Sequence, residues 1–238
     1  MFLKYNENIV VFAPQVAVNP QAALLGIVAR VLQDLGDDIK MVFCDSTFIY
    51  CPAMRCFGLS PDSSIEERAI ISKKCLQAAI DVTEHYGISE SIILDSKSES
   101  ESILKCQEIM SQYKDSGKSW LDFSYDGFDI GKCASYDATL SRKSLKLELD
   151  PKCKNTFIES IRDSLVSYLV IKNLTHRLNN SVFIYYNDYS ILHAAAKAAE
   201  NSNNTRSICI AHASHRNVDF RKITIYEGGT MAQTLNLS

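Results

Sequence analysis

The sequence predicts an α/β fold with an open, mostly parallel sheet and helices on both faces. A short run of β-branched and aromatic residues, 8–13, precedes a segment with apolar residues at helical spacing, 20–35, and a second apolar run, 39–44. Strand, helix and strand in this order form a right-handed crossover between parallel strands. A further strand and helix over 182–186 and 189–202 repeat the pattern. We therefore expect a Rossmann-like domain.

Helix start and stop signals indicate where the helices between these strands begin and end. Asn19 can cap the first helix, which Gly36 ends, and Ser63 or Ser64 opens a second helix that ends at Gly87. Further strands are expected at 91–94, 207–211 and 222–226, further helices at about 98–113, 131–142 and 153–178, and loops at 47–61 and 118–130. We predict one domain over 1–227, with 228–238 as a tail or the start of a linker.

Composition restricts the class of protein. The 238 residues are 46% hydrophobic and 22% charged, as in ordinary globular proteins. The net charge is −3 and no stretch gathers five Lys or Arg, which argues against nucleic acid as a partner. No apolar run approaches the roughly 20 residues that span a bilayer, so no transmembrane segment is expected, although peripheral association with a membrane stays open. The start of the chain lacks a secretory signal and the eight cysteines are scattered, so we predict a cytoplasmic protein with reduced thiols.

Ligands of open α/β sheets bind beyond the carboxyl ends of the strands. Asn19 lies at such a place, where helix N–H groups suit a phosphate, carboxylate or sugar hydroxyl, although a plain cap and turn is the favoured alternative. Asp45 ends the second strand and can bind a sugar hydroxyl or cap the following turn. Cys44, Cys51 and Cys56 share this region, but their spacing is not that of a common zinc site, so no metal is predicted. The glycine fingerprints of nucleotide sites are missing after the first strand, so no cofactor is predicted.

Two carboxylates and a glycine precede the helix at 131–142. Asp126 and Asp129 are the candidate catalytic bases, because a carboxylate beside a Gly-rich turn can accept a proton from a hydroxyl, and Gly127 belongs to the same candidate site. A simple turn with Asp129 as N-cap is the alternative. Arg142 is a candidate substrate ligand or a solvated charge at a helix end.

The last candidates follow the strands near the C-terminus. Asn187 and Asp188 form a polar turn before a helix and are predicted to bind substrate hydroxyls, with an ordinary helix cap as the alternative. His212 is a candidate in the next loop, together with His215, because a histidine can act as a base near neutral pH. No nucleophile signature such as GxSxG is present.

Four segments together resemble one known family. They are LLGIVARVLQDLGDDIKMVFCD (24–45), CPAMRC (51–56), YDGFDIGKCASYDATLSRK (125–143) and FIYYNDYSILHAAAKAAE (183–200). They are similar to the N-terminal half of GT-B glycosyltransferase-like proteins of bacterial capsule and surface-polysaccharide biosynthesis. The resemblance implies a domain that binds a glycan or lipid-linked sugar acceptor. It also implies a second domain or chain for the nucleotide-sugar donor.

The resulting hypothesis is an acceptor-side glycosyltransferase domain, incomplete as an enzyme alone, or a fragment, since the chain ends at Ser238 shortly after Gly228 and Gly229. A non-catalytic Rossmann-like binding or scaffold domain is the alternative. A Rossmann-type oxidoreductase is disfavoured, because the dinucleotide fingerprint is absent.

Overall fold

A computed structural model of the chain describes residues 7–179, 181–187, 189–203, 205–212 and 223–227. Its strands are β1 (Asn8–Phe12), β2 (Asp38–Asp45), β3 (Glu90–Asp95), β4 (Val182–Tyr186), β5 (Arg206–His212) and β6 (Ile223–Glu227). They form one sheet in the order β3-β2-β1-β4-β5-β6, in which β6 alone among the described strands runs antiparallel. This arrangement confirms the predicted α/β fold.

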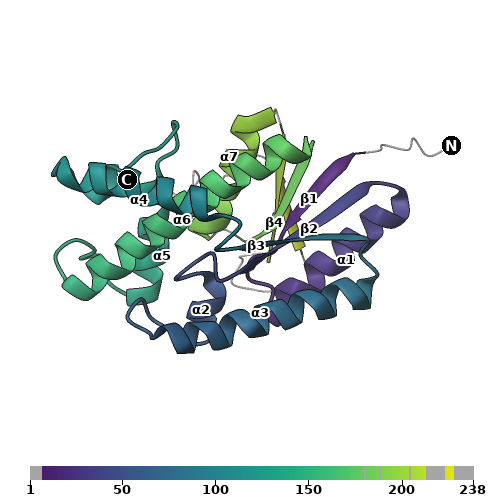
Figure 1. Cartoon of the computed structure of the whole chain (residues 1–238), viewed down its shortest axis with the longest axis horizontal. Coiled ribbons are helices and arrows are strands. Elements are labelled where there is room, and N and C mark those ends of the chain that lie inside the picture. Colours follow the sequence, from purple (N-terminus) through teal and green to yellow (C-terminus); the bar gives the residue numbers. More distant parts are fainter. Residues whose placement is uncertain (1–6, 180, 188, 204, 213–222, 228–238) are drawn as a thin grey trace.

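Helices cover both faces of this sheet (Figure 1). They are α1 (Asn19–Leu35), α2 (Pro52–Cys56), α3 (Ile65–Tyr86), α4 (Ser100–Asp115), α5 (Ile130–Arg142), α6 (Pro151–Leu178) and α7 (Ser190–Asn203), with a short 3-10 helix at Trp120–Asp122. On one side α1 and α3 pack on each other and on β2, and on the other α7 packs on β4, β5 and α6. α4, α5 and α7 all contact α6, and α6 is buried along most of its length.

The helix ends show where local sequence signals hold. Ser64 caps α3 through a reciprocal pair of hydrogen bonds with Glu67, and Gly36 ends α1 in the left-handed conformation with φ 100°. Asn19 differs from the prediction, because α1 already includes it and Val18 occupies the cap position without a side-chain bond. The short helix α2 lies inside the expected loop at 47–61, since five residues are too few to show a helical period.

No helix in the described ranges is both long and apolar enough to cross a membrane. The prediction of a single domain over 1–227 stays a prediction, and 228–238 lie outside the described residues.

Asp163, in the middle of α6, fixes the segment between β2 and α2. Its carboxylate is fully buried and accepts hydrogen bonds from the backbone N–H groups of Ile49 at 3.0 Å and Tyr50 at 2.5 Å. The neighbouring Arg162 adds an ion pair with an N–O distance of 2.5 Å. A buried carboxylate is tolerated only when donors and a counter-charge replace water, as they do here.

We expect Asp163→Ala to lower the free energy of unfolding by about 3–5 kcal/mol, because it leaves a largely buried guanidinium and two N–H groups without their acceptor. Urea denaturation measures this loss. The control is Asp34→Ala, which breaks the exposed Arg30–Asp34 pair and should change stability little. Equal losses in both variants would show that the Asp163 carboxylate does not hold this segment.

Candidate functional site

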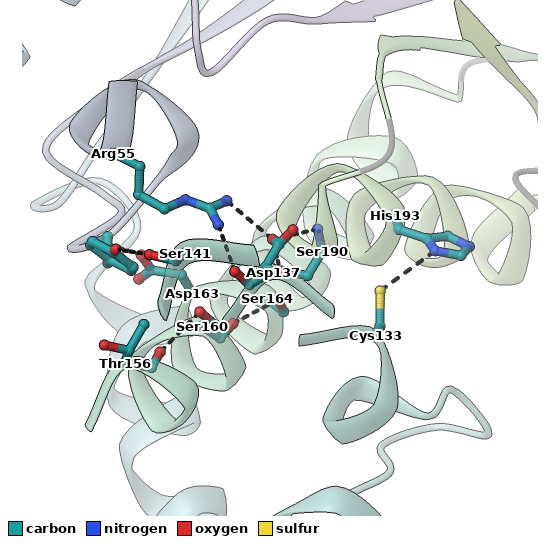
Figure 2. A network of polar contacts seen from close by, with 11 residues as sticks. Arg55, Cys133, Asp137, Ser141, Thr156, Ser160, Asp163, Ser164, Ser190 and His193 are labelled. Atoms are coloured by element: carbon teal, nitrogen blue, oxygen red, sulfur yellow. Dashed lines mark hydrogen bonds and ion pairs between the residues drawn. The ribbon is translucent and has the colours of Figure 1, made fainter. Parts of the chain in front are cut away.

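The sheet has a switch point between β1 and β4, where successive strands begin to add on the opposite side. Loops that follow β1, β2 and β4 meet there, and this is where open α/β sheets bind ligands. α5 contacts α6 and α7 and brings Asp137 to this region. Figure 2 shows the polar side chains that these elements bring together.

An ion pair forms the centre of this site. Arg55 Nη2 of α2 lies 3.2 Å from Asp137 Oδ2 of α5, and Arg55 Nη1 also approaches the Asp137 carbonyl oxygen at 3.4 Å. Ser190, the first residue of α7, donates to Asp137 Oδ2 from its backbone N–H at 2.9 Å and from its hydroxyl at 2.7 Å. Asp137 is 2% exposed and Arg55 15% exposed. Three separate elements therefore meet on one buried carboxylate.

Two tyrosine rings flank the guanidinium of Arg55. The ring centres of Tyr50 and Tyr189 lie 5.6 Å and 5.2 Å from the guanidinium carbon. Burial works to lower the pKa of Arg55, but Asp137 and the tyrosines outweigh it and the pKa is raised. Arg55 is therefore charged at all physiological pH values. We call Arg55, Asp137, Ser190, Tyr50 and Tyr189 the Arg55–Asp137 cluster.

Several buried polar atoms of this region have no hydrogen-bond partner among the described residues. They include Asp137 Oδ1, Arg55 Nε and the side-chain oxygens of Gln15 and Gln21. Gln15 follows β1 and donates to the Tyr186 carbonyl at the end of β4, so it lies at the switch point itself. Folded proteins seldom leave buried polar atoms unsatisfied. The cluster thus contains one acceptor, Oδ1, and one donor, Nε–H, that the described protein groups leave unsatisfied.

The predicted bases lie in a turn at the start of α5. Asp126 is 42% exposed and pairs with Lys172 at 2.5 Å, and the Tyr168 hydroxyl donates to it at 2.8 Å. The hydrogen bond from Lys172 is the main reason why the pKa of Asp126 is lowered. Asp129 occupies the N-cap position without a capping bond and pairs with Lys132 at 2.8 Å. Gly127 has a φ of 77° in the same turn. Their catalytic roles stay predictions.

The predicted ligands are spread over the ends of the elements. Asp45 accepts from the Ser46 hydroxyl at 3.0 Å, and Arg142 Nε donates to Thr156 Oγ1 at 2.6 Å. Asn187 has a φ of 71° and directly follows β4. Asn19 begins α1 and His212 ends β5, while Asp188 and His215 lie outside the described residues.

Of the three cysteines between the end of β2 and the end of α2, Cys44 and Cys51 are buried thiols. Burial raises the pKa of Cys44 well above its ordinary value and that of Cys51 to about 12, whereas Cys56 is exposed. Within the described residues no group of three or more His, Cys, Asp or Glu is placed to hold a metal ion.

Sequence reasoning missed Arg55 and Asp137 and treated Ser190 only as a helix cap. A signal for Asp137 exists, since it shares the buried face of α5 with Ile130, Ala134 and Ala138. A carboxylate on an apolar helix face must find a buried partner. Nothing in the sequence indicates that this partner is Arg55, which is 82 residues away along the chain.

Comparison with known proteins finds similarity in structure only. No family model matches the sequence, and no curated protein matches it. Among solved structures, a CDPS (cyclodipeptide synthase) from Fluoribacter dumoffii matches with a TM-score of 0.54 and 11% sequence identity, over 85% of this chain and 88% of that chain. At this identity the match shows a shared fold.

The structural match corrects the glycosyltransferase interpretation. The matching protein is a CDPS, and the match covers most of that chain rather than one half of a two-domain GT-B enzyme, so the GT-B resemblance is wrong. The function that followed from it is wrong as well, and the match does not support the alternative of a non-catalytic scaffold. So are the partners: the glycan or lipid-linked acceptor, the nucleotide-sugar donor and the exclusion of nucleic acid. The resembling segments are helix and strand patterns common to many α/β sheets, which explains the error.

Arg55 and Asp137 should be energetically coupled. We expect Arg55→Met alone to cost about 3–5 kcal/mol in unfolding free energy, because Asp137 then keeps an uncompensated buried charge. The double variant with Asp137→Asn should cost less than the sum of the two single variants, by about 1–3 kcal/mol. Urea denaturation of the unmodified chain, the two single variants and the double variant gives the coupling energy. Additive losses would show that the two side chains are not coupled.

Proposed function

We propose that this chain is an enzyme that acts on aminoacyl groups, as the tRNA-dependent cyclodipeptide synthase of the same fold does, and that it binds them at the Arg55–Asp137 cluster. One observation carries the proposal. A buried carboxylate oxygen and a buried guanidinium N–H, each without a described partner, belong to the same ion pair at the switch point of the sheet.

The Arg55–Asp137 ion pair favours a ligand that carries both a hydrogen-bond donor for Asp137 and a hydrogen-bond acceptor for Arg55. An aminoacyl group carries an ammonium two bonds away from its carbonyl carbon. Asp137 Oδ1 can accept from the ammonium, and Arg55 Nε can donate to the carbonyl oxygen. A ligand with only negative charge satisfies Arg55 but not Asp137, and a simple cation does the reverse. Burial strengthens both contacts, because water does not compete with the ligand.

The cluster is also held in place before a ligand arrives. The two hydrogen bonds from Ser190 fix Asp137 Oδ2, which leaves Oδ1 for the ligand. Tyr50 and Tyr189 flank Arg55, and the Tyr50 hydroxyl lies 2.6 Å from Ser141 Oγ. Preorganised donors and acceptors stabilise charge without rearranging during a reaction. Arg55 is the more exposed partner of the ion pair, so we place the entry of the substrate on its side.

A second feature supports a substrate attached to RNA. Lys114, Lys118 and Lys154 line a groove of about 780 Å³ between the end of α4 and the start of α6. Lys114 and Lys118 are four residues apart and Lys154 lies 36 residues further along the chain, so they form no basic run. Lysines gathered in a groove can neutralise phosphates. We therefore propose that aminoacyl-tRNA is the substrate and that this protein acts in the cytoplasm.

The test is product formation by the full chain. Purified protein is incubated with a mixture of aminoacyl-tRNAs, and cyclic dipeptides are measured by liquid chromatography and mass spectrometry. We expect Asp137→Asn to lower kcat/KM about 10- to 100-fold, because a charged hydrogen bond contributes about 1.5–3 kcal/mol.

The matched control is Asp34→Asn on the exposed face of α1, which should keep the activity of the unmodified chain. Urea denaturation of each variant separates loss of activity from loss of fold. Absence of cyclic dipeptides with every aminoacyl-tRNA, or equal activity of Asp137→Asn and Asp34→Asn, would refute the proposal.

A further inference from the structure

α5 and α7 meet through two successive pairs of side chains. Asp137 of α5 contacts Ser190 of α7, and one turn earlier on α5 the Cys133 sulfur lies 3.5 Å from Nδ1 of His193. Figure 2 shows the Cys133–His193 pair beside the Arg55–Asp137 cluster. A thiol and an imidazole therefore lie directly beside the proposed substrate site.

The surroundings of this pair suit a reactive thiol. His193 is 7% exposed and its ring packs against Phe128 with a centroid distance of 5.5 Å, which restricts the orientation of the imidazole. Cys133 lies in the first turn of α5, where the helix dipole stabilises a thiolate. An imidazole within hydrogen-bond reach can take the thiol proton.

Exposure separates Cys133 from most other cysteines. It is partly exposed, whereas six others are buried: Cys44, Cys51, Cys75, Cys106, Cys153 and Cys209. Cys56 is exposed and provides an internal comparison. A nucleophile needs access to its substrate, and the buried thiols lack it.

The nearby charges are paired with one another. On α5, Asp129 pairs with Lys132 and Asp137 with Arg55. On α7, Lys197 pairs with Glu200, and Lys172 of α6 pairs with Asp126. The imidazole of His193, 3.5 Å from the sulfur, is a base within reach of the Cys133 thiol proton.

We propose that Cys133 is a nucleophile that accepts an acyl group from an activated ester, with His193 as its general base. His193 Nδ1 takes the thiol proton and the sulfur attacks the ester carbonyl carbon. The C–S bond forms, the C–O bond breaks, and the leaving alkoxide takes the proton back from His193. The products are a thioester on Cys133 and a free hydroxyl on the leaving group, so no further reactant is needed.

The spacing along α5 fits an aminoacyl ester. Four residues separate Cys133 from Asp137, a rise of about 6 Å. An ammonium hydrogen-bonded to Asp137 lies about 2.9 Å from that carboxylate. The carbonyl carbon is two bonds further from Asp137, so the ligand extends along about one helical turn, and attack requires this carbon to come within roughly 3–3.5 Å of the sulfur. The choice of an aminoacyl ester rests on the proposed function, whereas the reactive thiol does not.

The first experiment measures thiol reactivity in the full chain. Each cysteine is alkylated with iodoacetamide between pH 5 and 9, and peptide mass spectrometry gives its rate. We expect Cys133 to react at pH 6 at least about tenfold faster than Cys56. His193→Gln should remove this advantage and shift the pH profile of Cys133 upward, with the profile of Cys56 unchanged. Matching profiles for the two cysteines in the unmodified chain would overturn the proposal.

The second experiment traps the thioester. The chain is mixed with an amino acid p-nitrophenyl ester or with aminoacyl-tRNA, and the mass of the Cys133 peptide is measured. An acyl mass on Cys133 from either ester, absent in Cys133→Ala, supports the nucleophile. Acylation by the p-nitrophenyl ester alone supports Cys133 and counts against aminoacyl-tRNA as the substrate. Absence of acylation by both esters overturns the nucleophile, even if cyclic dipeptides form.

Discussion

The carboxylate of Asp163 connects the buried helix α6 to the segment that carries the functional side chains. This carboxylate accepts hydrogen bonds from the backbone N–H groups of Ile49 and Tyr50, and α2, which carries Arg55, follows within a few residues. On the same helix, the Ser167 hydroxyl donates to the Ile191 carbonyl of α7 at 2.8 Å. α6 thus positions the elements on both sides of the ion pair.

Buried polar side chains are possible on α6 because the helix itself satisfies them. Ser160 and Ser164 donate to carbonyl oxygens one turn earlier, at 2.9 Å and 2.7 Å, and Thr175 does the same at 2.8 Å. Such bonds let a hydroxyl enter the core without an orphaned donor. They also allow α6 to pack against α4, α5 and α7 although its sequence is mixed in polarity.

The sequence predicts the sheet well and the site poorly, for one physical reason. β4 is buried at all five positions and α3 begins with a capping box, so each leaves a local pattern. The ion pair leaves none, because Arg55 and Asp137 belong to different elements and meet only in the folded chain. Candidates chosen by position after a strand, such as Asp45 and Asn187, do lie at strand ends. That position alone does not identify which side chain is buried without a partner.

α5 carries residues of the proposed site and also packs against α7. Cys133, Asp137 and Ser141 follow one another at intervals of four residues, so they share one face of this helix. Along that face they meet His193, then Arg55 with Ser190, then Tyr50. A change in the rotation of α5 therefore moves the thiol, the carboxylate and the support of Arg55 together. Because the same contacts stabilise the packing of α5 on α7, the geometry of the proposed reaction depends on interactions that also hold the fold.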